Sequence, residues 1–303
     1  MKEKGPLWVL YPKINRYVGL PNENIEMQLV VQNLSESALY FSKAEISPSW
    51  AEDKKGIKTL QGRDYLSSGD SMFLTEFCLR LPSKPGLYTL KFGLETWIYN
   101  YYTTNWENLG VLRTSNWGYM QVTPHPFRKA FISYSSRKED VPIVEQIITM
   151  IRLWGFEPVR VGINVLSEDP AKIPDDIKNQ IKKCDAFIGI ATPRDYSIQE
   201  RRFKTFPWLH VESGEAFQSD KPLLFIVDER MKPEGLLEYS DFPKVFYHPT
   251  KLDILEHRLA VIMPGFRKWI AGKKQKDFLD GLVKAGLILG GIWLVAKALE
   301  EKK

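Results

Sequence analysis

Length, composition and charge already narrow the classes of protein to which this chain can belong. Its 303 residues exceed one domain of ordinary size, about 150 residues, so we expect two. A hydrophobic content of 44% and a charged content of 26% are typical of globular chains and exclude whole-chain disorder. The net charge of +5 is too small to indicate a nucleic-acid partner. Two cysteines and four scattered histidines exclude a disulfide scaffold and a zinc site.

Residues 1–124 have the pattern of an antiparallel β-sandwich. Apolar and polar residues alternate in segments 25–32, 72–81 and 87–99, as in half-buried strands, and turn-forming residues separate them. Short strands at this spacing resemble prokaryotic immunoglobulin-like domains. No catalytic cluster is visible in this half, so we expect it to receive an activating protein or ligand.

Aromatic residues are concentrated near the end of this first domain: Trp97, Tyr99, Tyr101, Tyr102, Trp106, Trp117 and Tyr119. They could form a platform for a ligand such as a sugar. We favour a place in the sandwich core and a folded-back loop, because aromatic side chains contribute most to the interior of such domains.

The hydrophobic pattern changes after the proline-containing linker at 123–126. Short apolar segments now alternate with helical patterns, the segments lying at 129–134, 156–161, 185–191, 222–227 and 244–247 and the helices at 141–154, 174–183, 207–218 and 252–270. This alternation predicts a flavodoxin-like α/β domain at 128–272, with a parallel five-stranded sheet in the order 2-1-3-4-5. The whole chain is therefore expected to be an α+β multidomain protein.

Ligands of such sheets bind at the carboxyl ends of the first and third strands. These two ends carry hydroxyl and guanidinium groups, from Ser133, Tyr134, Ser135, Ser136, Arg137, Thr192 and Arg194. Such groups suit a ligand that contains phosphate or ribose. The chain has neither a glycine-rich dinucleotide motif nor a P-loop, which argues against a bound redox cofactor and against an NTPase. Glu212, in the second turn of the helix that begins at Pro207, is the carboxylate expected near this edge.

Two motifs in this half resemble the TIR (Toll/interleukin-1 receptor) domain, over about residues 128–270. The sequence FISYSS at 131–136 is similar to the opening box of the family, and WLHVE at 208–212 matches its W-x-x-x-E pattern in the helix after the third strand. The family contains signalling adaptors and, often in prokaryotes, enzymes that cleave NAD between nicotinamide and ribose. The glutamate of W-x-x-x-E is catalytic in those enzymes. The resemblance therefore implies that Glu212 is catalytic, that NAD is the substrate without a further cofactor, and that the chain acts in defence or signalling after assembly.

One carboxylate is sufficient for this reaction. Nicotinamide leaves NAD as a neutral base, so no proton donor is needed, unlike in ordinary glycoside hydrolysis. The positive charge that develops on the ribose needs an ionised carboxylate, and a glutamate with an ordinary pKa of about 4.3 is ionised at neutral pH. We expect Glu212 to bind the ribose hydroxyls and stabilise this charge. The polar residues at the two strand ends, together with Trp208, are expected to bind substrate.

Two departures from the family pattern limit the resemblance. The loop at 162–173 lacks the usual glycine before its helix, which leaves the mode of self-association open. Phe206 occupies the position two residues before the tryptophan where the family has serine, so substrate contacts of the loop at 194–206 are not carried over. Two other functions stay open: a non-catalytic TIR interaction module, and a nucleoside or nucleotide glycosyl transferase on a similar fold. The product, ADP-ribose or its cyclic form, also stays open.

The segment 278–300 is a hydrophobic helix by its pattern. Its uncharged part, 285–296, is shorter than the roughly 20 residues that span a bilayer, although Lys284 and Lys297 could extend it as snorkelling ends. Gly286 and Gly290 would let two such helices pack closely. The alternatives are a membrane anchor and a self-associating amphipathic helix. The basic residues before the segment would keep the rest of the chain cytoplasmic, at the inner face of the membrane.

Overall fold

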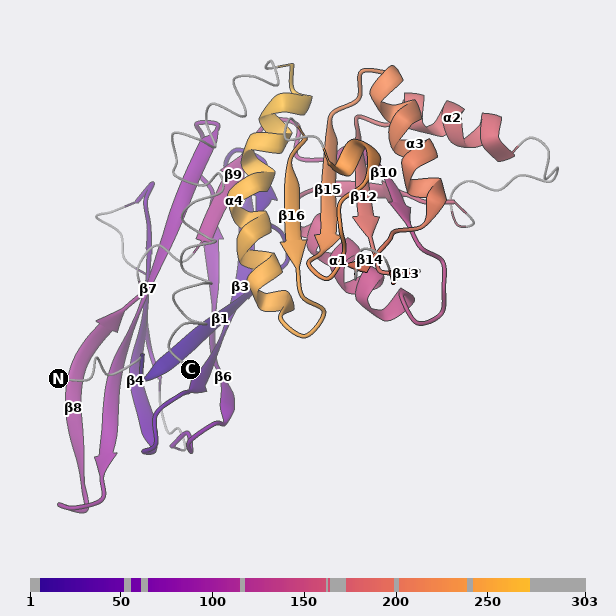
Figure 1. The fold of residues 1–303 in the computed structure, drawn as a ribbon. Coiled ribbons are helices and arrows are strands. Elements are labelled where there is room, and N and C mark those ends of the chain that lie inside the picture. Colours follow the sequence, from indigo (N-terminus) through magenta and orange to yellow (C-terminus); the bar gives the residue numbers. More distant parts are fainter. Residues whose placement is uncertain are drawn as a thin grey trace. The chain divides into compact units, whose positions relative to one another are not determined.

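The computed structural model describes residues 6–51, 56–60, 65–114, 118–161, 163, 173–198, 202–238 and 242–272. The chain divides into two compact units, Met1–Pro126 and Phe127–Lys303. The first unit is built from β-strands, and the second from strands and helices in alternation (Figure 1). The predicted mixture of antiparallel β structure and a parallel five-stranded sheet is thereby confirmed.

The first unit contains two sheets. One has the order β1 (Trp8–Ile14), β3 (Asn24–Asn33) and β6 (Ser71–Arg80). The other has the order β2 (Val18–Gly19), β9 (Gly118–Val122), β7 (Gly86–Asn100), β4 (Leu39–Pro48) and β5 (Gly56–Thr59), and β8 (Asn105–Arg113) also pairs with β7. The strand pairs are antiparallel except for β2 with β9, which is parallel.

The two sheets pack face to face around an apolar core. Strand β3 shows why, because every second residue from Ile25 to Val31 is fully buried while the residues between them are more exposed. Trp8 of β1 crosses to the other sheet, where its ring meets that of Phe41 at 6.5 Å and its Nε1 donates to Thr96 Oγ1 at 3.2 Å. The core of this unit therefore lies between the two sheets.

The expectation that the aromatic cluster lies in the sandwich core and a folded-back loop is wrong as to the core, since none of its described members is buried. Trp106 contacts the rings of Tyr40, Tyr65 and Tyr99, yet it is itself exposed, as are Tyr101 and Tyr102 at the tip of the β7–β8 hairpin. Register explains this outcome. The core-facing pair between β4 and β7 is Phe41 with Thr96, so the next pair, Tyr40 with Trp97, faces the opposite side of the sheet. Trp117 lies outside the described residues.

The second unit is built on five parallel strands. They are β10 (Arg128–Tyr134), β11 (Phe156–Val159), β12 (Ala186–Ala191), β15 (Leu223–Asp228) and β16 (Lys244–Tyr247). The sheet order is β11-β10-β12-β15-β16, which is the predicted order 2-1-3-4-5. The connections hold α1 (Val141–Leu153), α2 (Ile173–Lys183), α3 (Pro207–Gln218) and α4 (Leu252–Ile270), with a short hairpin of β13 (Tyr196–Ser197) and β14 (Arg202–Phe203) and a 3-10 turn, η2 (Gly235–Leu237).

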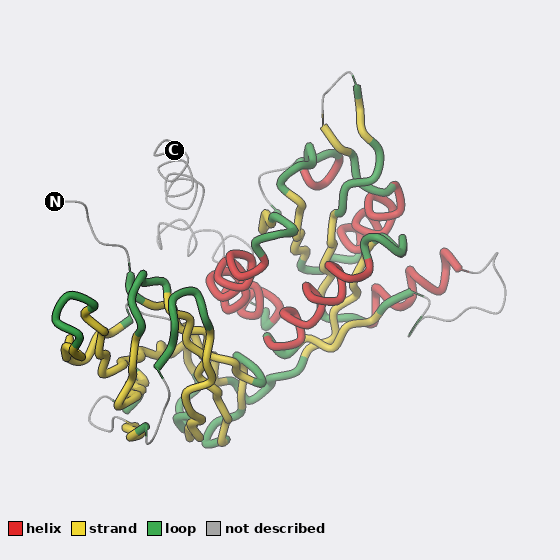
Figure 2. Tube along the Cα trace, turned by 90° about the horizontal axis from the view of Figure 1, so that it is seen from below, coloured by secondary structure: helices red, strands yellow, loops and turns green. Residues whose placement is uncertain are grey.

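Helices cover both faces of this sheet. Figure 1 shows α4 beside β16 and α3 with α2 beyond β12, and Figure 2 shows the helices in red and the strands in yellow from below. On one face, side chains of α2 and α3 form a single core with Phe131, Phe187 and Phe225 of the three central strands. On the other face, Phe266 of α4 packs against Phe156 of β11 at 5.9 Å. Double coverage explains why β12 and β15 are buried along their whole length.

Some sequence-based predictions fall outside the described residues. The hydrophobic segment at 278–300 is one of them, and most of the loop at 162–173 is another. Within the described part of the chain, no helix combines the length and the hydrophobicity needed to cross a bilayer.

Candidate functional site

Glu212 lies on the face of α3 that packs against the sheet. Pro207 at the first position of the helix sets its start, and Leu209 and Ala216, one turn before and one turn after Glu212, are fully buried in the core shared with the strands. The Glu212 side chain is itself only 6% exposed. The carboxyl group is therefore directed at the sheet and away from solvent.

A glycine in β12 allows α3 to lie this close. A Cβ atom on Gly189 would come within 2.7 Å of Leu209 Cδ1 and 2.8 Å of Phe225 Cδ1, distances that real Cβ atoms do not show. The missing side chain leaves space for the first turns of α3 above the carboxyl half of the sheet. Glu212 is thereby held next to Ser133, near the end of β10.

The electrostatic state of Glu212 differs from the one expected from the sequence. Burial raises the pKa of its carboxyl group from 4.5 to about 7, and the nearby Ser133 hydroxyl lowers this pKa by a smaller amount. The expectation of an ordinary pKa, and hence of a fully ionised side chain at neutral pH, is wrong. Burial thus favours the protonated carboxyl group to a higher pH than in an exposed glutamate.

Ser133 and Tyr134 of β10 face opposite sides of the sheet. Ser133 is buried on the face covered by α3, while the half-buried Tyr134 lies on the other face, with its ring 6.0 Å from the Arg160 guanidinium. Ser135, which follows β10, is also buried. Ser136 is exposed. Tyr134 and Glu212 are thus on different faces, so the structure does not bring all of the predicted binding residues together.

Arg137 and Thr192 are engaged in a network that joins two loops. Arg137 Nε donates to Asp140 Oδ2 at 3.1 Å, and its terminal nitrogen donates to the Pro193 carbonyl. Thr192 Oγ1 donates to the same Asp140 oxygen at 3.1 Å. The network ties the loop after β10 to the loop after β12, and both side chains serve there as structural links. Arg194, in contrast, is exposed.

Trp208 lies on α3 one turn before Glu212 and is 49% exposed. The neighbouring Val211 is exposed as well. Trp208 is thus not a buried core residue, and it does not share the buried environment of Glu212.

Sequence reasoning missed several buried polar residues at the carboxyl edge of the sheet. Asp140 is the residue before α1, and Asp228 ends β15, where it accepts two hydrogen bonds from the Arg230 side chain, at 2.8 and 2.7 Å. Tyr247 ends β16, and burial raises the pKa of its phenol. Asp228 and Tyr247 could have been predicted from the sequence, since each is the polar residue at the end of an apolar strand. The described residues contain no cluster of ligands that could hold a metal ion.

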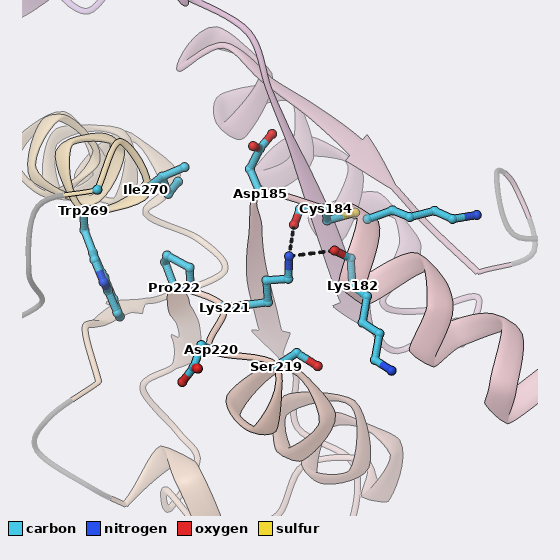
Figure 3. Close-up of a pocket in the computed structure, with 11 residues that line it drawn as sticks. Lys182, Cys184, Asp185, Ser219, Asp220, Lys221, Pro222, Trp269 and Ile270 are labelled. Atoms are coloured by element: carbon cyan, nitrogen blue, oxygen red, sulfur yellow. Dashed lines mark hydrogen bonds between the residues drawn. The ribbon is translucent and has the colours of Figure 1, made fainter.

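A surface depression of about 520 Å³ lies at the other end of the sheet, near the starts of β12 and β15 (Figure 3). Lys221 Nζ there donates to the carbonyls of Lys182 and Cys184, at 2.7 and 2.8 Å. A cation at these carbonyls stabilises the carboxyl end of α2. The depression is therefore formed by helix and strand ends, away from Glu212.

Comparisons with known proteins assign no family to the chain. No family model matches it, and no curated protein matches it. Three solved structures illustrate the level of similarity. The CARDB domain of PF1109 from Pyrococcus furiosus is 16% identical at a TM-score of 0.25, over 38% of this chain and 87% of that domain. The CMP N-glycosidase BcmB of Clostridium botulinum is 18% identical at a TM-score of 0.30, over 42% of this chain and 99% of that enzyme.

The third is a cycloisomaltooligosaccharide glucanotransferase of Paenibacillus sp.. It is 8% identical at a TM-score of 0.32, over 72% of this chain and 44% of the transferase. None of these three proteins is a TIR domain. Similarity at these scores supports no statement about the activity of the chain.

Proposed function

We propose that the chain is an NAD nucleosidase of the TIR type, with Glu212 as its catalytic carboxylate. In this proposal the first unit is an immunoglobulin-like domain and the second is a flavodoxin-like TIR domain. The observation that supports it most is the placement of Glu212. It is a buried carboxyl group at the carboxyl half of a parallel sheet, next to a strand hydroxyl, where this type of sheet binds its ligands.

The proposed reaction breaks the bond between the nicotinamide nitrogen and C1′ of the ribose. The bonding electron pair goes to the nitrogen, which changes from a positively charged pyridinium to neutral nicotinamide. The positive charge then lies on the ribose ring, where ionised Glu212 stabilises it. Water adds to C1′ and releases a proton to give ADP-ribose. The cyclic form results if the adenine attacks C1′ instead.

A second candidate function follows from the raised pKa of Glu212. A protonated carboxyl group at neutral pH can act as a general acid. Nucleosides and nucleotides with an uncharged base need such an acid, because that base leaves as an anion unless it is protonated. A glycosyl transferase or hydrolase acting on these substrates is therefore the alternative, and it uses the protonated form of the same residue.

The remaining parts of the proposal rest on the sequence. They are activation by assembly through TIR surfaces and the C-terminal segment, a trigger that binds the first unit, and a cytoplasmic location at the inner face of the membrane. A TIR module that only binds other TIR surfaces is the non-enzymatic alternative. It requires no particular side chain at position 212.

The test is incubation of the full chain with NAD and, separately, with a pyrimidine nucleotide, with the released base and the sugar product identified by mass. We expect free nicotinamide from NAD, and a loss of about 100-fold or more in Glu212→Gln. Glu215→Gln is the matched control, because Glu215 lies on the same helix and pairs with Lys178 at 3.1 Å. It should keep the wild-type rate. Wild-type protein that releases neither base would leave the interaction module as the function.

A further inference from the structure

Ser133 carries a buried hydroxyl group that lacks a well-formed hydrogen bond among the described residues. Its side chain is 2% exposed, and within the described part of the chain its Oγ atom has no hydrogen-bond partner of normal geometry. A buried hydroxyl without a partner is unfavourable and rare in folded proteins. The group that lies near it is the carboxyl of Glu212.

The two neighbouring buried serines differ from Ser133 in this respect. Ser135 Oγ accepts a hydrogen bond from the backbone N–H of Arg137 at 3.4 Å. Ser213, which follows Glu212 on α3, donates to the carbonyl of His210 at 3.2 Å. Both hydroxyls therefore serve the local backbone. Ser133 Oγ has no such backbone partner, and the carboxyl group of Glu212 is the polar group near it.

We propose that Ser133 is a positioning residue for the reaction proposed above, and that its hydroxyl donates a hydrogen bond to ionised Glu212. This inference rests on the proposed function for its catalytic meaning. A hydroxyl hydrogen can rotate toward either partner, so ionisation of the carboxyl supplies the acceptor that Ser133 lacks. The hydrogen bond fixes one carboxylate oxygen on the sheet and leaves the other for the ribose.

The elements packed around Glu212 offer no described cation that could take this role. In β12 and β15 the residues on this face are Gly189 and apolar side chains. Lys178 of α2 is paired with Glu215, and His210 of α3 lies against Gly235 of η2. Neither of these groups contributes to the pKa of Glu212, which responds to burial and to Ser133. Removal of the Ser133 hydroxyl should therefore raise this pKa further.

The first measurement needs no enzymatic activity. The raised pKa means that the folded state retains a proton that the unfolded state has lost, so Glu212 reduces stability as pH rises from about 4.5 to about 7. Glu212→Gln has no ionisable group at this position, so its stability should not fall over this pH range for this reason. The stability difference between wild type and Glu212→Gln should grow over that range and level off above it, as followed by thermal unfolding of the full chain.

The same difference is then measured in the Ser133→Ala background. We expect the pH at which this stability difference levels off to rise by about one unit, because the ionised carboxyl group has lost the hydrogen bond from Ser133. Ser133→Thr, which keeps the hydroxyl, should restore the wild-type position. It also serves as the second variant if Ser133→Ala does not fold. Ser213→Ala is the matched control and should leave the plateau in place.

The second measurement is the pH profile of NAD cleavage. In Ser133→Ala it should shift to higher pH by the same amount, with a lower kcat and an unchanged KM, and Ser133→Thr should recover both. If neither the stability plateau nor the profile moves in Ser133→Ala, Ser133 is not a positioning residue. If the plateau moves but wild-type protein does not cleave NAD, the contact between Ser133 and Glu212 stands and the NAD proposal fails.

Discussion

A glutamate in water is ionised at neutral pH, but the packing of α3 against β10 and β12 changes this for Glu212. The sequence identifies the residue through the W-x-x-x-E pattern. It cannot give the degree of burial, which depends on β10 and β12, two strands that lie far from Glu212 in the chain. At the scale of the residue, the environment therefore decides which protonation state is available for chemistry.

Cleavage of NAD by the wild-type chain should increase with pH. The carboxylate is the form that stabilises a positive ribose, and its population falls as pH falls through the pKa of about 7. Between about pH 6 and pH 8 the rate should rise about tenfold and then level off. Initial rates of nicotinamide release across this range provide the check. The rate of cleavage of a nucleotide with an uncharged base would instead fall as pH rises, because that reaction requires the protonated form of Glu212.

At the scale of the element, most helix and strand positions follow from local pattern. Pro207 begins α3 as expected, and the apolar segments become the buried strands of the parallel sheet. The exception is the β7–β8 hairpin, where composition indicated core but register places Tyr99 and Trp106 on the outer face. Aromatic content alone does not show which side of a strand is covered.

The distance between α3 and the sheet should depend on Gly189. In Gly189→Ala the added methyl group would overlap Leu209 and Phe225, so we expect a loss of about 1–3 kcal/mol in unfolding free energy. Gly214→Ala is the control within α3, where a Cβ atom meets nothing within 4 Å. It should stabilise the helix by up to about 1 kcal/mol. Urea unfolding of both variants measures the difference, and equal effects would contradict the packing argument.

At the scale of the whole molecule, the chain consists of two units with separate cores and a hydrophobic C-terminal segment. The core of the second unit is formed by the sheet with α2 and α3 on one face, and the core of the first by two facing sheets. The segment at 278–300 lies outside the described residues, so its role as an anchor stays a prediction from hydropathy and from the pair Gly286 and Gly290.

Removal of residues 278–303 should lower the rate of NAD cleavage or shift the membrane partitioning of the chain. The apolar side chains of this segment favour lipid over water, and the two glycines favour close packing between copies. Fractionation of cells that express the full and the shortened chain measures partitioning into membranes. The specific rate of NAD cleavage measures the effect of packing between copies on activity. A shortened chain that partitions and reacts like the full one would show that the segment has neither role.

The sequence by itself determined the alternation of strands and helices, because periodicity and turn residues are local properties. The strand order followed from the usual order of such sheets, and Glu212 from its place in the helix after the third strand and from the W-x-x-x-E resemblance. Only the tertiary structure decided that Glu212 is buried beside Ser133, that Arg137 and Thr192 link two loops, and that Trp106 is exposed. These properties depend on which side chains meet across elements distant in the chain. The desolvation, the hydrogen bonds and the pKa of each group arise from those contacts.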